Sequence, residues 1–228
     1  MVNYVADNTG RFPQRPYYPQ EELDRECEQI IGDFLKGLYG HAHYPVITDD
    51  LTKLIERDAE DLDLYADLSI YGDDVEGVTE FRKGHKPRVM ISAALSNDER
   101  RENRLRTTLT HEYGHVRFHA YLWELTPSSP GGSKDRPHPD KVICKRGSIT
   151  GAAQSDWMEW QAGYICGALL MPKSAVLQLA RELPEASKPV AVGTPEAGSL
   201  INQITKTFLV SEDAARVRLL KLSLLSES

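Results

Sequence analysis

Apolar side chains recur at helical spacing in the first part of the chain. Between residues 21 and 38 they fall every three or four positions, and Gly40 follows as a suitable helix stop. A second, short helix is expected after Thr48 or Asp49, because both residues are good caps. Residues 1–19 hold several prolines and tyrosines without periodicity, which predicts an extended, flexible N-terminal arm.

The period changes between residues 62 and 94. Apolar side chains alternate with others at 62–66, residues 88–92 are strand-like, and turn-forming residues stand at 72–74 and 83–85. This pattern predicts about three short antiparallel strands.

Helical spacing returns after the strands. Ser96 and Glu99 have the spacing of a capping box and predict a helix that runs to about Trp123. Further helices are expected over residues 156–171, 173–183, 199–207 and 211–225. Together with the strands, these helices indicate an α+β fold that is mainly helical.

Two stretches rich in proline, glycine and small residues interrupt this pattern. Residues 126–151 predict an insertion loop, and residues 184–198 predict a linker. The expected organisation is a flexible arm, a main domain that contains the insertion, and a linker with a small helical C-terminal region, over residues 1–19, 20–183 and 184–228.

The composition is that of an ordinary globular protein. Hydrophobic residues make up 40% of the chain and charged residues 27%. The net charge of -7 argues against non-specific binding to nucleic acid, and no apolar run is long enough to span a membrane. The three cysteines form no C-x-x-C pair and the N-terminus lacks the pattern of a signal peptide, so we expect a cytoplasmic location.

The sequence H-E-Y-G-H at residues 111–115 indicates a metal site on the helix expected after Ser96. His111 and His115 are four residues apart, so their imidazoles lie on one face of a helix and can reach one metal ion. Glu112 can reach a water on that metal and act as a general base. The alternative interpretation is a helix with two histidines that bind no metal.

A catalytic zinc ion needs a third protein ligand, and several residues are candidates. Tyr121 occupies the position at which metzincins carry a third histidine. Glu159 is the main candidate, but Asp156 and Glu159 also have the spacing of a capping box, and spacing alone does not separate the two roles. Asp156 and Glu124 are weaker candidates.

Three residues near the motif have less specific patterns. His119 lies one turn beyond His115 and is expected to support a ligand or pack, because one straight helix does not usually supply three ligands. Cys166 could close a structural zinc site, but a buried packing role is favoured. Cys144 stands beside two basic residues in the insertion, where a solvated loop is favoured over a metal or nucleic-acid contact.

Two motifs together resemble the ImmA/IrrE family of zinc metallo-endopeptidases. Residues 104–119 read RLRTTLTHEYGHVRFH, and residues 159–172 read EWQAGYICGALLMP. In that family a helix with H-E-x-x-H is followed by a second helix of the form E-x-x-A…L-L-M-P, whose leading glutamate completes the zinc site. By position this glutamate is Glu159, so the resemblance implies a zincin-like fold in which His111, His115 and Glu159 hold Zn²⁺.

The resemblance covers residues 45–172 and implies a metalloprotease of gluzincin-like type. Family members cut helix-turn-helix repressors of mobile elements or stress responses, so such a repressor is the expected protein substrate. The chain departs from the family at Ile165 and Cys166, where Phe-Ala is usual, and in its long insertion. No helix-turn-helix segment precedes the peptidase motif, so direct binding to nucleic acid is not expected, and neither is binding to a membrane.

Hydrolysis at this site would use the metal to activate water and Glu112 to accept its proton. His119, Tyr113 and Tyr164 are candidates for a supporting or oxyanion-stabilising role. The strands before the helix could offer an edge to an extended substrate. The alternatives are a zinc-containing sensor or partner-binding module without proteolytic activity, and a structural helix pair without metal.

Overall fold

The computed structural model describes residues 3–125, 141–145, 156–181 and 189–227. Within these residues the chain is an α+β protein in which helices predominate and the strands form three small sheets. The elements in chain order are β1 (Asn3–Ala6), β2 (Gln14–Tyr17), α1 (Gln20–Tyr39), α2 (Thr48–Asp58), β3 (Asp61–Ala66), the 3-10 helix η1 (Ser69–Tyr71), β4 (Val75–Glu80), β5 (Arg88–Ser92), α3 (Ala93–Ser96), the 3-10 helix η2 (Glu99–Arg101), α4 (Glu102–Phe118), α5 (Tyr121–Leu125), β6 (Lys141–Lys145), α7 (Trp157–Leu170), α8 (Lys173–Ala180), β7 (Val190–Ala191), α9 (Pro195–Phe208), α10 (Glu212–Lys221) and β8 (Leu225–Ser226).

The first described element is a β-hairpin, where the sequence predicts a flexible arm. Strands β1 and β2 pair antiparallel. The Asp7 carboxylate accepts hydrogen bonds from the backbone N–H of Phe12 (2.9 Å) and from the indole N–H of Trp157 on α7 (3.0 Å). A local turn and a contact far along the chain therefore order this segment, and neither produces periodicity in the sequence.

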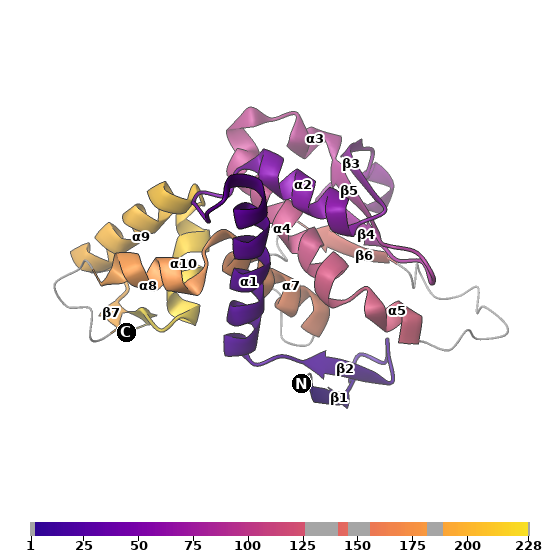
Figure 1. Ribbon diagram of the computed structural model, residues 1–228, viewed down its shortest axis with the longest axis horizontal. Helices are drawn as coiled ribbons and strands as arrows, with labels where there is room; N and C mark the ends of the chain where they lie inside the picture. Colours follow the sequence, from indigo (N-terminus) through magenta and orange to yellow (C-terminus); the bar gives the residue numbers. More distant parts are fainter. Residues whose placement is uncertain (1–2, 126–140, 146–155, 182–188, 228) are drawn as a thin grey trace.

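Helices α1 and α2 form where the apolar spacing predicts them. α1 is capped at its C-terminus by Gly40, whose φ of 78° lies in the left-handed region that favours glycine. Its buried face packs on α7, and α2 packs on α4. The two helices thus flank the pair of helices that carries the candidate site, as Figure 1 shows.

The main sheet has the strand order β3-β5-β4-β6. β4 runs antiparallel to β5 and β6, but β3 runs parallel to β5, so the prediction of a purely antiparallel sheet was wrong. The fourth strand of this sheet, β6, comes from the stretch predicted as an insertion loop, residues 126–151; the rest of that stretch lies outside the described residues. β6 escapes prediction because its apolar run, residues 142–144, is short and lies in a stretch otherwise rich in proline and glycine.

The single helix expected from Ser96 to Trp123 is divided into several pieces. Ser96 ends α3, and the side chain of Asp98 caps the next turn by accepting from the backbone N–H of Arg100 (3.2 Å). α4 then begins at Glu102, and a break after Phe118 separates it from α5. The prediction of a capping box at Ser96 is therefore wrong, because Asp98 caps the turn that begins at Glu99.

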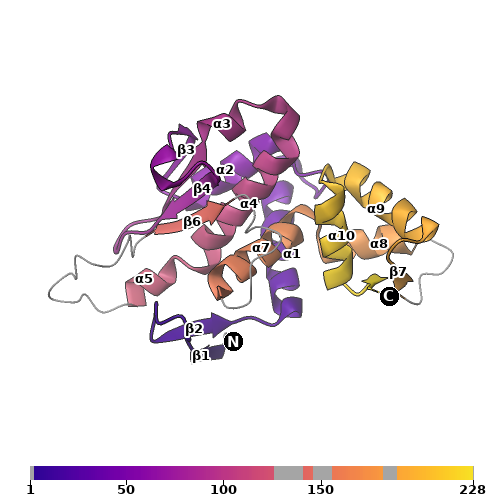
Figure 2. The ribbon, with the colours of Figure 1, turned by 180° about the vertical axis from the view of Figure 1, so that it is seen from behind.

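The C-terminal helices α8, α9 and α10 gather at the end of the molecule away from the main sheet (Figures 1 and 2). β7 pairs in parallel with β8, so part of the predicted linker is a strand, and α9 begins at Pro195 within that linker. Ser211 caps α10 as predicted, accepting from the backbone N–H of Ala214 (3.2 Å). Among the described residues no single helix is long and apolar enough to cross a membrane; α7 and α8 pass on length and composition only as a pair, bent by 58°.

Candidate metal centre

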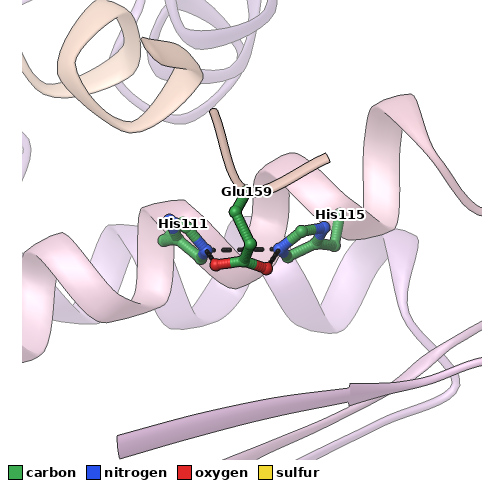
Figure 3. Close-up of side chains that lie close together, drawn as sticks. All are labelled: His111, His115 and Glu159. Atoms are coloured by element: carbon green, nitrogen blue, oxygen red, sulfur yellow. Dashed lines mark hydrogen bonds and ion pairs between the residues drawn. The ribbon is translucent and has the colours of Figure 1, made fainter. Parts of the chain in front are cut away.

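The candidate site lies where α4 and α7 cross. His111 and His115 stand one turn apart on α4, and both are fully buried. α7 approaches closely at Gly114, where an added Cβ would lie 3.3 Å from the Cα of Ala162. Because Ala162 is one turn beyond Glu159, this approach brings Glu159 over the two imidazoles. Figure 3 shows its carboxylate between the rings, with one oxygen toward each.

Three distances of 3.2 Å bring the two imidazole nitrogens together with the two oxygens of the Glu159 carboxylate. His111 Nε2 lies 3.2 Å from His115 Nε2 and 3.2 Å from Glu159 Oε2. His115 Nε2 lies 3.2 Å from Glu159 Oε1. Ligand atoms around a tetrahedral zinc ion, with bonds of about 2.0–2.1 Å, are about 3.3–3.4 Å apart. The separations therefore fit one small divalent ion bound to all three residues.

The electrostatics of this cluster also favour a cation. Within the described residues Glu159 Oε1 receives no hydrogen bond, although the residue is only 7% exposed. Burial raises the pKa of Glu159, but the imidazoles of His111 and His115 outweigh burial and hold that pKa well below its usual range. Glu159 is therefore a carboxylate. Two imidazoles and one carboxylate are a ligand set that zinc uses at hydrolytic sites, so these residues fit Zn²⁺.

A chain of hydrogen bonds orients His115. The Pro16 carbonyl accepts from Gln161 Nε2 (3.1 Å), so the Gln161 amide oxygen faces His119 Nε2 (3.0 Å). That oxygen can only accept, which puts the proton of His119 on Nε2 and leaves its Nδ1 to accept from His115 Nδ1 (2.9 Å). His115 Nε2 is then unprotonated and able to bind a metal. Burial and the nearby His115 hold the pKa of His119 well below its usual value, which keeps His119 neutral.

Glu112 is held between α4 and β4. The Thr79 hydroxyl donates to Glu112 Oε2 at 2.5 Å. Gly77 leaves room for the carboxylate, since a Cβ there would lie 2.9 Å from Glu112 Cδ. Burial raises the pKa of Glu112, although the imidazoles of His115 and His111 oppose this. Its Oε1 has no hydrogen-bond partner in the described part of the chain, so this oxygen is available to accept a proton.

Cys144 also belongs to this cluster, which corrects the expectation of a solvated loop. It is fully buried on β6 and stands opposite Gly77 of β4. The donor atoms of Cys144, His111 and Glu112 lie within 4.8 Å of one another and form a second group that could hold a metal ion. Burial raises the pKa of the Cys144 thiol to about 11, so at neutral pH the free group is a thiol.

Two of the candidate supporting residues have other partners. The Tyr113 hydroxyl donates to Asp58 Oδ2 at 2.6 Å. The Tyr164 hydroxyl donates to Asp24 Oδ2 at 3.0 Å. Of the three candidates for a supporting or oxyanion-stabilising role, His119 is the one that the structure brings into contact with a residue of the metal group.

The weaker ligand candidates also lie elsewhere. Glu124 accepts a hydrogen bond from the backbone N–H of Gly84 (2.7 Å). Asp156 precedes α7 without a side-chain capping bond, so the capping-box interpretation of Glu159 does not describe this helix. The Cys166 thiol lies 3.1 Å from the Thr110 hydroxyl, on the packing side of α7. None of them joins a metal group among the described residues.

Sequence reasoning missed three residues of the site, Gly77, Thr79 and Gln161, and it considered but did not favour a metal contact for Cys144. Gly77 and Thr79 shape the place of Glu112, Cys144 lies beside it, and Gln161 orients His119. Neither 75–80 nor 141–145 alternates between apolar and polar residues, and the contacts of Gly77, Thr79 and Cys144 with α4 are long-range, so no local signal in the sequence marks these three residues. Comparisons of the sequence with models of protein families and with curated proteins found no match.

Proposed function

We propose that the protein is a zinc-dependent endopeptidase. The observation that supports this most strongly is the arrangement of His111, His115 and Glu159, whose donor atoms are 3.2 Å apart, with Glu112 buried beside them. The resemblance of the two helix motifs to the ImmA/IrrE family adds independent support. The resemblance and the geometry of the site point to the same four residues: His111, Glu112, His115 and Glu159.

Each of these residues has one role in the proposal. His111, His115 and Glu159 would hold Zn²⁺ and leave a coordination position for a reactant. Bound zinc would supply Lewis acidity, which polarises a peptide carbonyl and makes water a stronger acid. Glu112 Oε1 would accept a proton from the attacking water, and the proton would then pass to the leaving amine. The Thr79 hydroxyl donates to the other carboxylate oxygen, Oε2, and keeps the carboxylate in position.

The substrate we propose is a helix-turn-helix transcriptional repressor of a mobile element or a stress response. This part of the proposal rests on the resemblance, because ImmA/IrrE peptidases cut repressors of that kind. The protein would meet its substrate in the cytoplasm, through protein contacts alone and without binding nucleic acid or a membrane itself.

A zinc-containing sensor or partner-binding module without proteolytic activity is the second candidate. One observation favours it: His111, Glu112 and His115 are fully buried in the structure. A sensor needs only the metal, whereas a peptidase needs a route for the substrate. The two candidates share the metal ligands and differ in the role of Glu112.

The metal ligands are tested by elemental analysis of purified protein. Wild type should carry close to one zinc per chain, and Glu159→Ala should lose most of it on dialysis. Glu124→Ala, which removes a glutamate outside the metal groups, is the matched control and should keep its zinc. Full retention of zinc by Glu159→Ala, or no zinc in wild type after zinc is supplied, would contradict the proposed site.

The reaction is tested with Glu112→Gln. This variant should keep zinc but cleave a purified candidate repressor slower by a factor of about 10²–10⁴, because it lacks the general base. Cleavage at the wild-type rate would rule out the proposed role of Glu112. Stoichiometric binding of a repressor without cleavage, by wild type and variant alike, would favour the sensor.

A further inference from the structure

The edge of β4 that lies over the candidate site is covered by β6. β4 pairs with β5 on one side, and on the other side its residues 77–79 pair with residues 142–144 of β6. Two of these β4 residues, Gly77 and Thr79, are the ones against Glu112. Figure 2 shows β6 beside β4 and next to α4. A chain that pairs with β4 next to the general base must take the place of β6.

With β6 in position, the site is closed. His111, Glu112 and His115 are fully buried, and Glu159 is 7% exposed. Cys144 is the β6 residue whose donor atom lies within 4.8 Å of those of His111 and Glu112. Hydrolysis requires the scissile carbonyl to reach these same groups, so a peptidase with this site has to open.

β6 is suited to leave without unfolding the rest of the sheet. It has five residues, and within the described sheet it pairs with β4 only, at the edge. Its removal leaves β3, β5 and β4 paired as they are. Short edge segments open locally at a lower free-energy cost than core strands do.

We propose that β6 is a displaceable strand that closes the site, and that the β4 edge beneath it docks an extended segment of the substrate. This inference rests on the proposed peptidase function. The substrate would add to the sheet as a strand, antiparallel to β4, in place of β6. The polypeptide backbone would supply hydrogen bonds, and its side chains would fill the positions that β6 vacates.

The side chains of β6 show which residues such a segment would carry. Val142 and Cys144 are buried, whereas Lys141 and Ile143 are partly exposed. A fitting segment would therefore have β-branched or small apolar residues at alternate positions, with a small one nearest Glu112. On the other face of the strand Ile143 packs against the apolar cluster of Ala66, Leu68, Val75 and Val78, so an apolar side chain fits there too, whereas a polar one fits at the position of Lys141.

The first test locks β6 to β4. Glu80 and Lys141 stand opposite each other at one end of the pair, so the variant Glu80→Cys/Lys141→Cys can form a disulfide across the two strands. The variant Glu80→Cys/Arg88→Cys places a matched disulfide between β4 and β5 and leaves β6 free. Mass spectrometry of the oxidised proteins confirms each bond before the test.

Alkylation of Cys144 by iodoacetamide under native conditions measures the displacement of β6. In the locked protein Cys144 should react at least tenfold more slowly than after reduction of the disulfide, and the β4–β5 control should show no such difference. Cys27 and Cys166, which are buried in other elements, report global unfolding in the same samples. Equal rates in the locked and reduced protein, or a Cys144 rate that follows that of Cys27, would overturn the proposal.

The second test probes the docking surface. A synthetic peptide with the β6 sequence, carrying serine in place of Cys144, should raise the alkylation rate of Cys144 in wild type at least threefold and saturably. A peptide of the same composition in scrambled order is the control. If neither peptide accelerates alkylation, the β4 edge does not dock an extended chain.

These readouts use neither zinc nor catalysis, so their failure differs from failure of the proposed function, which would appear as absent zinc or uncleaved repressor. Where a repressor is cleaved, the oxidised Glu80→Cys/Lys141→Cys variant should cut it at least tenfold more slowly than the reduced form. Equal cleavage by the two forms would show that the substrate reaches Glu112 with β6 in place.

Discussion

Gly77 of β4 lies directly against Glu112 of α4, so close that a Cβ on Gly77 would be 2.9 Å from the Glu112 Cδ. The residue two positions on, Thr79, donates its hydroxyl to the same carboxylate at 2.5 Å. The general base that we propose is therefore positioned by the sheet as well as by its own helix. This relationship makes β4 part of the site and leads to two predictions.

Gly77→Ala should displace the Glu112 carboxylate without removing a metal ligand. We expect the turnover of a cleaved repressor to fall at least tenfold, because small misplacements of catalytic groups reduce rates strongly, while zinc content stays at the wild-type level. Gly32→Ala on α1 is the control: its Cβ would meet nothing within 4 Å, and it should leave turnover unchanged. Wild-type turnover in Gly77→Ala would show that this contact does not position Glu112.

Thr79→Val should weaken the proposed base by a different route. The substitution keeps the shape but removes the hydroxyl donor and leaves Glu112 Oε2 without its bond from Thr79. Since that bond favours the charged form, the pKa of Glu112 should rise further, and the acidic limb of the pH–rate profile should move to higher pH. Thr79→Ser keeps the donor and should restore the wild-type profile; an unmoved profile in Thr79→Val would contradict the role of Thr79.

The local patterns of the sequence predict most of the helices, although not the division of the one expected from Ser96 to Trp123, and they predict the histidines as a pair because four-residue spacing is a property of one helix. Glu159 is different. Its spacing from Asp156 is equally that of a capping box, and what decides between the roles is the close crossing of α4 and α7 at Gly114. No local pattern contains that crossing, so the resemblance to a family, rather than spacing, pointed to Glu159.

The strand β6 and the hairpin β1–β2 show the same limit. β6 has an apolar run of only three residues, 142–144, and its burial depends on pairing with β4, which lies more than sixty positions earlier in the chain. The hairpin is held through Asp7 to Trp157 and through Pro16 to Gln161, both contacts with α7. Periodicity reports burial along one element, and these segments are ordered by partners far away in sequence.

His119→Ala should weaken zinc binding without removing a ligand. Loss of a group that orients a metal-bound histidine typically costs 10–100-fold in affinity, and His119 is the partner of His115 Nδ1 at 2.9 Å. Gln161→Leu should act in the same direction but less, because it removes the next bond of the chain. Affinity is measured by competition with a chelator. The exposed His85 provides the control, and equal affinity in His119→Ala and His85→Ala would show that orientation of His115 does not need this chain.

Zinc affinity should fall as the pH falls, because an imidazole must lose its proton to bind metal. Glu159 does not set this limit: its pKa is held well below the usual range, so it stays ionised as the pH falls to about 5. With two histidine ligands the affinity should drop by up to about 100-fold per pH unit on the acid side. Glu159→Gln should weaken binding at every pH but keep that slope, and a slope that changes with this substitution would contradict the assignment.

Removal of Arg218 from its buried ion pair with Asp24, which joins α1 to α10 in the interior, should lower stability strongly, because it leaves a buried charge without its partner. Arg218 Nη1 lies 2.8 Å from Asp24 Oδ1, with the side chains 1% and 4% exposed. Arg218→Met keeps the aliphatic part of the side chain but removes the guanidinium and leaves the aspartate charge buried without its main partner, which typically costs about 3–5 kcal/mol.

Denaturant unfolding of Arg218→Met and of Arg216→Met tests this contribution. Arg216 is 43% exposed and lies 3.8 Å from the exposed Asp213, so its loss should change the free energy of unfolding by no more than about 0.5 kcal/mol. Arg218→Met combined with Asp24→Asn should recover part of the loss, since the buried charge is then gone. A loss of unfolding free energy in Arg218→Met no larger than in Arg216→Met would contradict this prediction. Tyr164 and Lys173, which also contact Asp24, would then stabilise the Asp24 charge without Arg218.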